Sequence, residues 1–149
     1  AGAGNGVLRG CVPDHLTAST LVLSHDGERV LLTLHAKARQ WFQLGGHCEA
    51  GDATLLAAAR REAHEESGIE SLRFEDAPLR LDLHDVPFCG DRPGVNHLDV
   101  WFLAVAEPEA LPAASDESVD VRWWDADSLP GDHAWQEAIT LVRSRLGVG

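Results

Sequence analysis

The chain has 149 residues, and 12 Lys and Arg against 24 Asp and Glu give it a formal net charge of −12. This length suits one domain over residues 1–149, and a hydrophobic content of 44% is enough for a core. The acidity argues against binding to nucleic-acid polymers, because a phosphate backbone attracts basic surfaces. It is compatible with a positively charged partner, of which a divalent cation is the smallest.

The cysteine pattern and the hydropathy indicate a cytoplasmic protein. Cys11, Cys48 and Cys89 are odd in number and form no CxxC pair, which favours reduced thiols over disulfides or a zinc ribbon. No apolar run approaches the ~18 residues that span a bilayer, so we expect no membrane association. Residues 1–10 are small and Gly-rich and lack the pattern of a signal peptide, which predicts a flexible N-terminus.

Turn signals and apolar runs predict consecutive strands in the first third of the chain. Asp26 and Gly27 form a strong hairpin turn signal between two β-rich runs. A shorter apolar run ends at the pair Gly45 and Gly46. The strands predicted here span Leu16–Ser24, Arg29–His35 and Trp41–Leu44.

The rest of the chain is predicted to contain two helices and three further strands. The first helix spans Ala53–Ser67, which has no Pro or Gly inside, with Asp52 or Thr54 as N-cap and Gly68 closing it. The last helix runs from about His133 to Leu146, with Asp132 and Gly147 as its caps. Strands are expected at Leu79–Val86, His97–Ala106 and Val119–Trp124, with an irregular loop over Glu107–Glu117. This order predicts an α/β domain with a mixed sheet between helices.

Three carboxylates in the first helix carry the chemical information. Glu62, Glu65 and Glu66 are three and four residues apart, so they share one helix face. They repel one another, and they lie in the last two turns, where the helix dipole disfavours anions. A bound divalent cation would remove these conflicts, and oxygen ligands suit Mg²⁺ or Mn²⁺ better than Zn²⁺. The alternative is a solvated acidic face with an Arg61–Glu65 pair worth ~0.3–0.5 kcal/mol.

The segment from Gly46 to Ile69 resembles the signature of the Nudix hydrolases, G-x5-E-x7-R-E-U-x-E-E-x-G-U, where U is a bulky apolar residue. From Arg61 onward it matches every defined position except Ala63, which is small for U. The first half departs twice, because Asp52 replaces Glu and one extra residue precedes the arginine. An insertion inside the helix would rotate everything upstream by about 100°. We therefore expect the loop around Asp52–Thr54 to absorb it, and the role of Asp52 stays open.

The resemblance implies a Nudix-type α/β/α sandwich with a central mixed β-sheet, and a Mg²⁺-dependent pyrophosphohydrolase. Such an enzyme cleaves a diphosphate bond in a nucleoside diphosphate linked to another moiety, by attack of a metal-activated water on phosphorus. Carried over to this chain, Glu62, Glu65 and Glu66 hold the metal with the carbonyl of Gly46, and Arg61 orients the glutamates. The expected partner is a small nucleoside diphosphate derivative, and a homodimer is compatible with the family.

The resemblance leaves the general base open between two glutamates. In many members of the family the base comes from a loop before a late Trp-containing strand, and Glu117 lies in the matching place. In other members the signature itself supplies the base, which makes Glu62 the second candidate.

Residues outside the signature are expected to contact the substrate. We expect Trp41 to stack on a base and Asp99 to lie at the rim of the site. The turn-rich segment Pro87–Val95 is a candidate substrate loop. Cys48, beside the Gly-Gly turn, is interpreted as a packed thiol. ADP-ribose, dinucleoside polyphosphates, oxidised nucleoside triphosphates and sugar nucleotides all stay open as substrates.

Two other functions are weighed against hydrolysis. A Nudix-like domain that senses a nucleotide without cleaving it usually lacks one or more signature glutamates, whereas this chain keeps all three. Isopentenyl-diphosphate isomerase shares the fold and uses a catalytic cysteine and a glutamate. This chain has Gly-Gly-His-Cys in place of that enzyme's cysteine motif, which favours hydrolysis.

Overall fold

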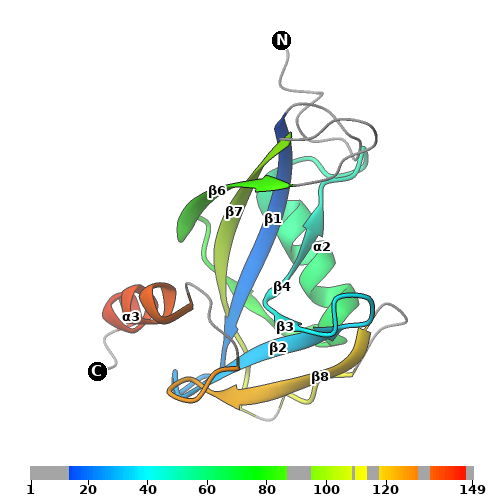
Figure 1. Ribbon diagram of the computed structural model, residues 1–149. Helices are drawn as coiled ribbons and strands as arrows, with labels where there is room; N and C mark the ends of the chain where they lie inside the picture. The colour runs from blue at the N-terminus through cyan, green and yellow to red at the C-terminus, as the bar shows by residue number, and fades with distance from the viewer. Residues whose placement is uncertain (1–13, 87–94, 109, 114–117, 131–134, 147–149) are drawn as a thin grey trace.

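The computed structural model describes residues 14–86, 95–108, 110–113, 118–130 and 135–146 (Figure 1). The strands are β1 (Asp14–Leu23), β2 (Arg29–His35), β3 (Trp41–Phe42), β4 (Leu44–His47), β5 (Arg73–Phe74), β6 (Arg80–Val86), β7 (Val95–Val105) and β8 (Ser118–Asp125). The described helices are α2 (Leu55–Ser67) and α3 (Trp135–Leu146). Neither helix is long and apolar enough to cross a membrane. The residues predicted as a flexible N-terminus and the predicted caps Asp132 and Gly147 lie outside the described residues.

The strands form one mixed sheet, as the sequence predicts, and the structure shows that it is built around a parallel pair. β1 and β7 are parallel along their whole common length, from Asp14 opposite Asn96 to Leu23 opposite Val105. All other pairs are antiparallel: β2 and β4 with β1, β3 and β8 with β2, and β5 and β6 with β7. The predicted hairpin between β1 and β2 is confirmed, and Gly27 adopts the left-handed φ of 75° that its turn needs.

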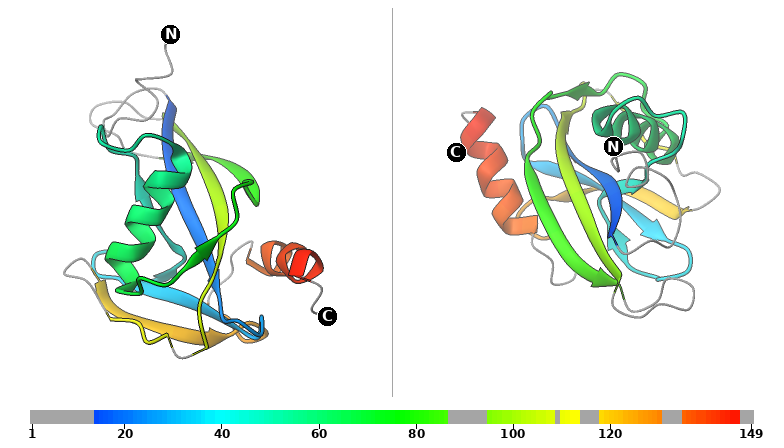
Figure 2. Two further views of the ribbon diagram at one scale, coloured as in Figure 1. Left: turned by 180° about the vertical axis from the view of Figure 1, so that it is seen from behind. Right: turned by 90° about the horizontal axis from the view of Figure 1, so that it is seen from above.

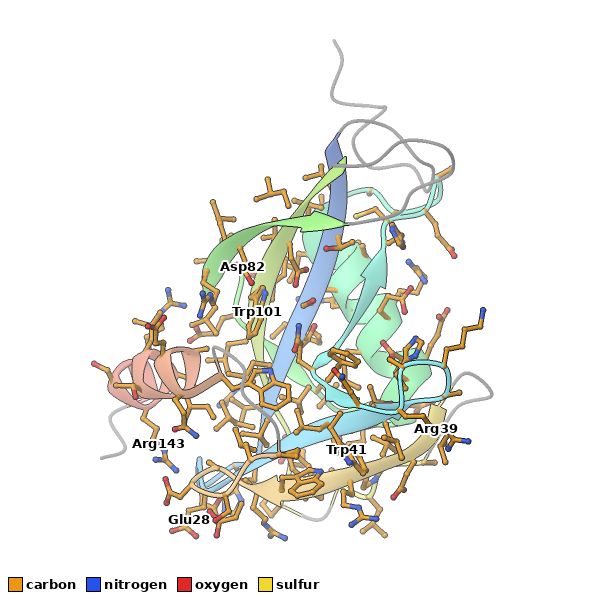
Figure 3. All side chains as sticks on the ribbon, viewed as in Figure 1. Glu28, Arg39, Trp41, Asp82, Trp101 and Arg143 are labelled. Carbon is orange, nitrogen blue, oxygen red and sulfur yellow. The ribbon has the colours of Figure 1, made fainter. Side chains whose placement is uncertain are left out.

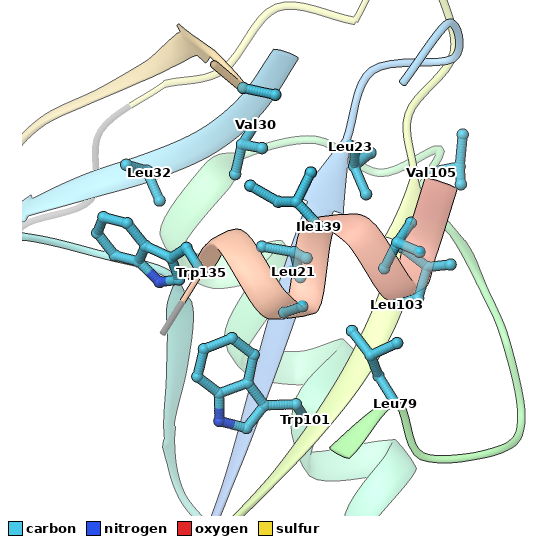
Figure 4. Close-up of a cluster of buried hydrophobic side chains, with 13 residues drawn as sticks. Leu21, Leu23, Val30, Leu32, Leu79, Trp101, Leu103, Val105, Trp135 and Ile139 are labelled. Carbon is cyan, nitrogen blue, oxygen red and sulfur yellow. The ribbon is translucent and has the colours of Figure 1, made fainter. Parts of the chain in front are cut away.

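The central strands are buried on both faces, which makes the fold a sandwich of three layers. Because side chains alternate along a strand, Leu21 and Leu103 pack in one cluster with α3 (Figure 4). Ala18 and Phe102 pack in another cluster with α2. The two helices lie on opposite sides of the sheet in both views of Figure 2. The α/β/α sandwich predicted from the resemblance is therefore confirmed.

Helix α2 begins and ends where its caps dictate. The Thr54 hydroxyl accepts a hydrogen bond from the Ala57 N–H at 3.0 Å, which makes Thr54 the N-cap. Gly68 closes the helix with a left-handed φ of 71°, and its N–H donates to the carbonyl of His64. The extra residue of the signature therefore lies in the loop before Thr54, as predicted, and the helix keeps its register.

Two strand predictions were wrong in detail. The segment predicted as one strand ending at the glycines is divided in two, and Gly45 and Gly46 lie inside β4, opposite Ser19 and Ala18 of β1. Glycine weakens an isolated strand, so only this pairing with β1 accounts for its position here. The two-residue strand β5 was not predicted, because it is too short to show a periodicity.

Candidate active site

The two glycines of β4 let the carboxylates of α2 approach the edge of the sheet. A Cβ at Gly46 would lie 2.8 Å from the carboxyl carbon of Glu62, and a Cβ at Gly45 would lie 2.7 Å from the carbonyl oxygen of Ala18. The Gly45 N–H donates a 2.8 Å hydrogen bond to the carboxylate of Glu66. A side chain at Gly46 would therefore clash with the Glu62 carboxylate of α2, and a side chain at Gly45 would clash with the neighbouring strand β1.

The three signature glutamates of α2 lie in different surroundings, and two of them lie against β4. Glu62 is only 8% exposed, next to Gly46, and Glu66 contacts Gly45. The side chain of Glu65 is 56% exposed to solvent. The helix thus presents two carboxylates against the strand and one toward solvent.

Arg61 ties the cluster to the preceding loop. Its Nε and Nη2 each donate to one oxygen of Asp52 at 3.0 Å, a bidentate geometry that fixes the plane of the guanidinium. Its Nη1 donates to Glu62 at 3.0 Å and to Glu65 at 3.4 Å, and Nη2 also donates to the carbonyl of His47. Asp52 therefore positions Arg61, which gives it the role that the sequence left open.

The Arg61–Asp52 pair makes part of the stability depend on pH. The guanidinium hydrogen bonds hold the pKa of Asp52 below its ordinary value of 3.8, and the same contact raises the pKa of Arg61. In the unfolded chain the carboxyl has a pKa of about 4, and in the folded chain its pKa is lower. The contact therefore stabilises the folded chain at pH values above about 4. This stabilisation is lost as the pH falls through the lowered pKa of the folded chain.

We therefore expect Asp52→Asn to lower the free energy of unfolding more at pH 7 than at pH 3. Urea unfolding of both proteins across this range measures the difference, which should shrink below about pH 4 because the wild-type carboxyl becomes protonated. Asp76→Asn, at an exposed position, is the matched control and should change little at either pH. If the difference in unfolding free energy between the two proteins did not change with pH, the Asp52–Arg61 contact would not be the source of the stabilisation.

The donor set at this edge fits a divalent cation such as Mg²⁺. It consists of carboxylate oxygens with a glycine backbone beside them, the ligands that hard cations take. Among the described residues, no three acidic, His or Cys side chains already converge as a metal cage. Part of the reason is that Arg61 donates hydrogen bonds to carboxylate oxygens of Glu62 and Glu65.

A cavity of about 410 Å³ opens beside the glycines. It extends from Glu66 across β1 and β7 to Trp135 of α3, whose indole N–H donates to Gln43 at 2.9 Å. The residues that line it are Thr17, Ser19, Thr33, His35, Phe42, Gln43, Gly45, Gly46, Glu66, Asp82, Asp99, Trp101 and Trp135. Carboxylates from α2 and polar groups from the sheet thus meet in one space.

The structure places Asp99 in this cavity. The residue is 6% exposed, and its carboxylate accepts 2.8 Å hydrogen bonds from the hydroxyls of Thr17 and Ser19 on the neighbouring strand. The parallel register puts Thr17 directly opposite Asp99, which explains the contact. Asp82 is a lining residue that sequence reasoning missed, because only the strand register brings it to this face.

Trp41 does not line the cavity. Its ring packs edge-on against Trp124 at 5.1 Å, and the guanidinium of Arg122 lies 5.1 Å above it. Neighbouring strand residues point to opposite faces, so the cavity is lined by Phe42 in place of Trp41. The alternation was the available signal, and it could have shown that only one of the two aromatic residues reaches the site.

Other predicted residues fall outside the cavity or outside the described chain. Glu117 lies outside the described residues, as does the candidate substrate loop except for Val95 at the start of β7. Cys48 is fully buried against Ala18 and Ala58, and burial raises the pKa of its thiol. It has the surroundings of a packed thiol, as predicted.

Comparisons with known proteins agree with this architecture. The family model described as NUDIX domain matches residues 13–143. A NUDIX family hydrolase from Clostridium perfringens has 24% identity and a TM-score of 0.66, over 86% of this chain and 97% of its own. An Ap4A hydrolase from C. elegans, solved as a binary complex, has 18% identity and a TM-score of 0.70, over 89% and 97%.

A third neighbour is the NUDIX domain of NrtR from Shewanella oneidensis, solved with ADP ribose. It has 21% identity and a TM-score of 0.65, over 88% of this chain and 87% of its own. At these identities the solved structures show the shared fold. The sequence has no match among curated proteins.

Proposed function

Because the chain belongs to the Nudix hydrolase family, we propose that it cleaves a diphosphate bond in a nucleoside diphosphate linked to another moiety, with Mg²⁺ as cofactor. The observation that carries this proposal is the edge of β4, where Gly45 and Gly46 lie against Glu66 and Glu62 beside the cavity. Mn²⁺ has the same preference for oxygen ligands and is the alternative ion.

The residues at this edge have different proposed roles in hydrolysis. Glu62, Glu65 and Glu66 would hold the cation, with the carbonyl of Gly46. When bound, the cation supplies charge neutralisation of the diphosphate and lowers the pKa of a water molecule. Arg61 keeps the glutamates oriented through its contacts with two of them.

The proton of the attacking water requires a separate base. We propose Glu117 for this role, with Glu62 as the alternative, because a carboxylate that holds the cation is less free to accept a proton. Turnover of Glu117→Gln and Glu62→Gln as a function of pH separates the two, because a general base must be deprotonated and its loss removes the acidic limb of the profile.

The relatives supply substrate classes to test. The similar solved structures include an Ap4A hydrolase, a domain bound to ADP ribose and a dihydroneopterin triphosphate pyrophosphohydrolase. We therefore propose a panel of dinucleoside polyphosphates, ADP-ribose, nucleoside triphosphates and sugar nucleotides. Products are followed as phosphate released after phosphatase treatment, with Mg²⁺ and with EDTA.

The outcomes of the panel distinguish the three candidate functions, which are a hydrolase, a sensing domain and an isomerase. Mg²⁺-dependent release from any member supports the hydrolase. Binding of a member without release would support a sensing domain instead. The isomerase has no support at Cys48, because a buried thiol with a raised pKa is a poor catalytic group.

A further inference from the structure

A second cavity lies on the side of helix α2 that faces away from the signature glutamates. It has a volume of about 480 Å³ and is formed by α2, the strand β5 and the segment that joins them. Arg60 and His64 line it from α2, and Arg73 and Phe74 line it from β5. Residues two positions apart on a helix point about 200° apart, so Arg60 is turned away from Glu62. The two cavities share no lining residue and are separate.

This second cavity contains two arginines that have no acidic partner. Most of the described arginines form ion pairs, as Arg143 of α3 does with Asp127 at 3.3 Å (Figure 3). Arg60 and Arg73 form no ion pair with any described residue, even with Glu70, a carboxylate that lines the same cavity. Two cations that share a cavity repel each other, and an anion bound to both would offset this repulsion.

Contacts within the second cavity hold its polar groups in place. The guanidinium of Arg60 lies 5.7 Å from the centroid of the Phe74 ring, which attracts a cation over its face. This contact occupies one side of the guanidinium and leaves N–H donors for a ligand. The Nδ1 of His64 lies 3.3 Å from the carbonyl oxygen of Ile69, which only accepts, so Nδ1 carries the hydrogen and Nε2 is left for a ligand.

We propose that this second cavity binds a phosphate group, held by the guanidinium groups of Arg60 and Arg73. Guanidinium forks match the oxygens of phosphate, and two cations favour its double charge over the single charge of a carboxylate. Ile69, Leu72 and Phe74 give the cavity an apolar side, on which the organic part of a phosphate ester can pack. The proposed site uses none of the signature glutamates, so it is independent of hydrolysis at the edge of β4.

Titration calorimetry with inorganic phosphate tests the proposed site. The full chain is titrated in EDTA, so that no divalent cation links phosphate to the glutamates. We expect saturable binding to the wild-type chain. The affinity should fall about tenfold or more in Arg60→Gln and in Arg73→Gln, because hydrogen bonds between charged groups are the strong ones.

Arg29→Gln is the matched control for the loss of one positive charge. Arg29 is also exposed and forms no ion pair with a described residue, but it lies outside the second cavity. Its substitution should leave the affinity for phosphate unchanged. Thermal melting checks that each variant folds. Arg73→Gln changes an exposed position of the short strand β5, so it keeps the test decisive if Arg60→Gln does not fold.

Amide spectra recorded during the titration locate the bound phosphate. Its addition should shift the NMR signals of the Leu72 and Arg73 amides and leave those of Gly45 and Gly46 unchanged. Shifts confined to the two glycines would overturn the proposal, because they would place the phosphate at the edge of β4. A titration without saturation, or an equal loss of affinity in Arg29→Gln, would overturn it as well.

AMP and adenosine distinguish the two sources of a phosphate group. Tighter binding of AMP than of inorganic phosphate, lost in Arg60→Gln and Arg73→Gln, assigns the site to phosphate esters. Binding of AMP that is no tighter assigns it to free phosphate. Adenosine lacks the group and should not compete with inorganic phosphate, so competition by adenosine as strong as that by AMP would contradict the proposal.

Discussion

Glu66→Gln is expected to abolish Mg²⁺-dependent turnover, with a loss of about 10³-fold or more in kcat, while the protein stays folded. The amide oxygen of glutamine can still accept the hydrogen bond that the Gly45 N–H now donates to Glu66. The substitution therefore removes the negative charge and keeps the contact between α2 and β4. A loss of activity without a loss of stability would show that turnover requires the negative charge of Glu66.

The same result is expected for Glu65→Gln, for a different structural reason. The side chain of Glu65 is mostly exposed, and its ion pair with Arg61 is a helix-surface pair worth little to stability. Stopped-time assays on the best substrate of the panel, over a range of Mg²⁺ concentrations, measure both variants. Glu70→Gln, at an exposed carboxylate just beyond the helix, is the control and should keep wild-type rates. Near-wild-type turnover from either glutamate variant would contradict the assignment of the metal site.

Much of the fold is visible in the sequence where local signals agree. The bounds predicted for β2 coincide with those observed, because a hairpin turn precedes an apolar run of clear period. Gly68 fixes the end of α2, since the left-handed cap has few alternatives. Trp135, Ile139 and Val142 form the buried face of α3, as their spacing of three and four residues along one helix favours. These features depend on the order of residues along one segment.

The features that the sequence left open depend on contacts between segments. The Asp52–Arg61 contact needs the path of the loop before α2, and a strand containing two glycines needs β1 beside it. Asp82 enters the cavity only through the register between β6 and β7. The shared helix face of the signature glutamates was predictable, because spacings of three and four residues are local. The residues that would determine substrate specificity come from several strands, so their proximity was not predictable.

Arg61→Lys is expected to reduce kcat/KM about 10–100-fold, although it keeps the positive charge. Arg61 donates through a planar fork to both oxygens of Asp52 and at the same time reaches Glu62 and Glu65. A lysine ammonium is a point charge on a flexible stem and cannot make these contacts together. The glutamates would then lose their common orientation, so the variant should need more Mg²⁺ for half-maximal rate.

A double-mutant cycle with Asp52→Asn distinguishes this positioning role from a purely structural one. If Asp52 acts through Arg61, the double variant should lose little more activity than Arg61→Lys alone, because residues that share contacts are not additive. Arg122→Lys, whose guanidinium lies 5.1 Å over the ring of Trp41, is the matched control and should leave the Mg²⁺ requirement unchanged. Additive losses in the cycle, or a wild-type Mg²⁺ requirement in Arg61→Lys, would mean that the arginine holds the loop without ordering the glutamates.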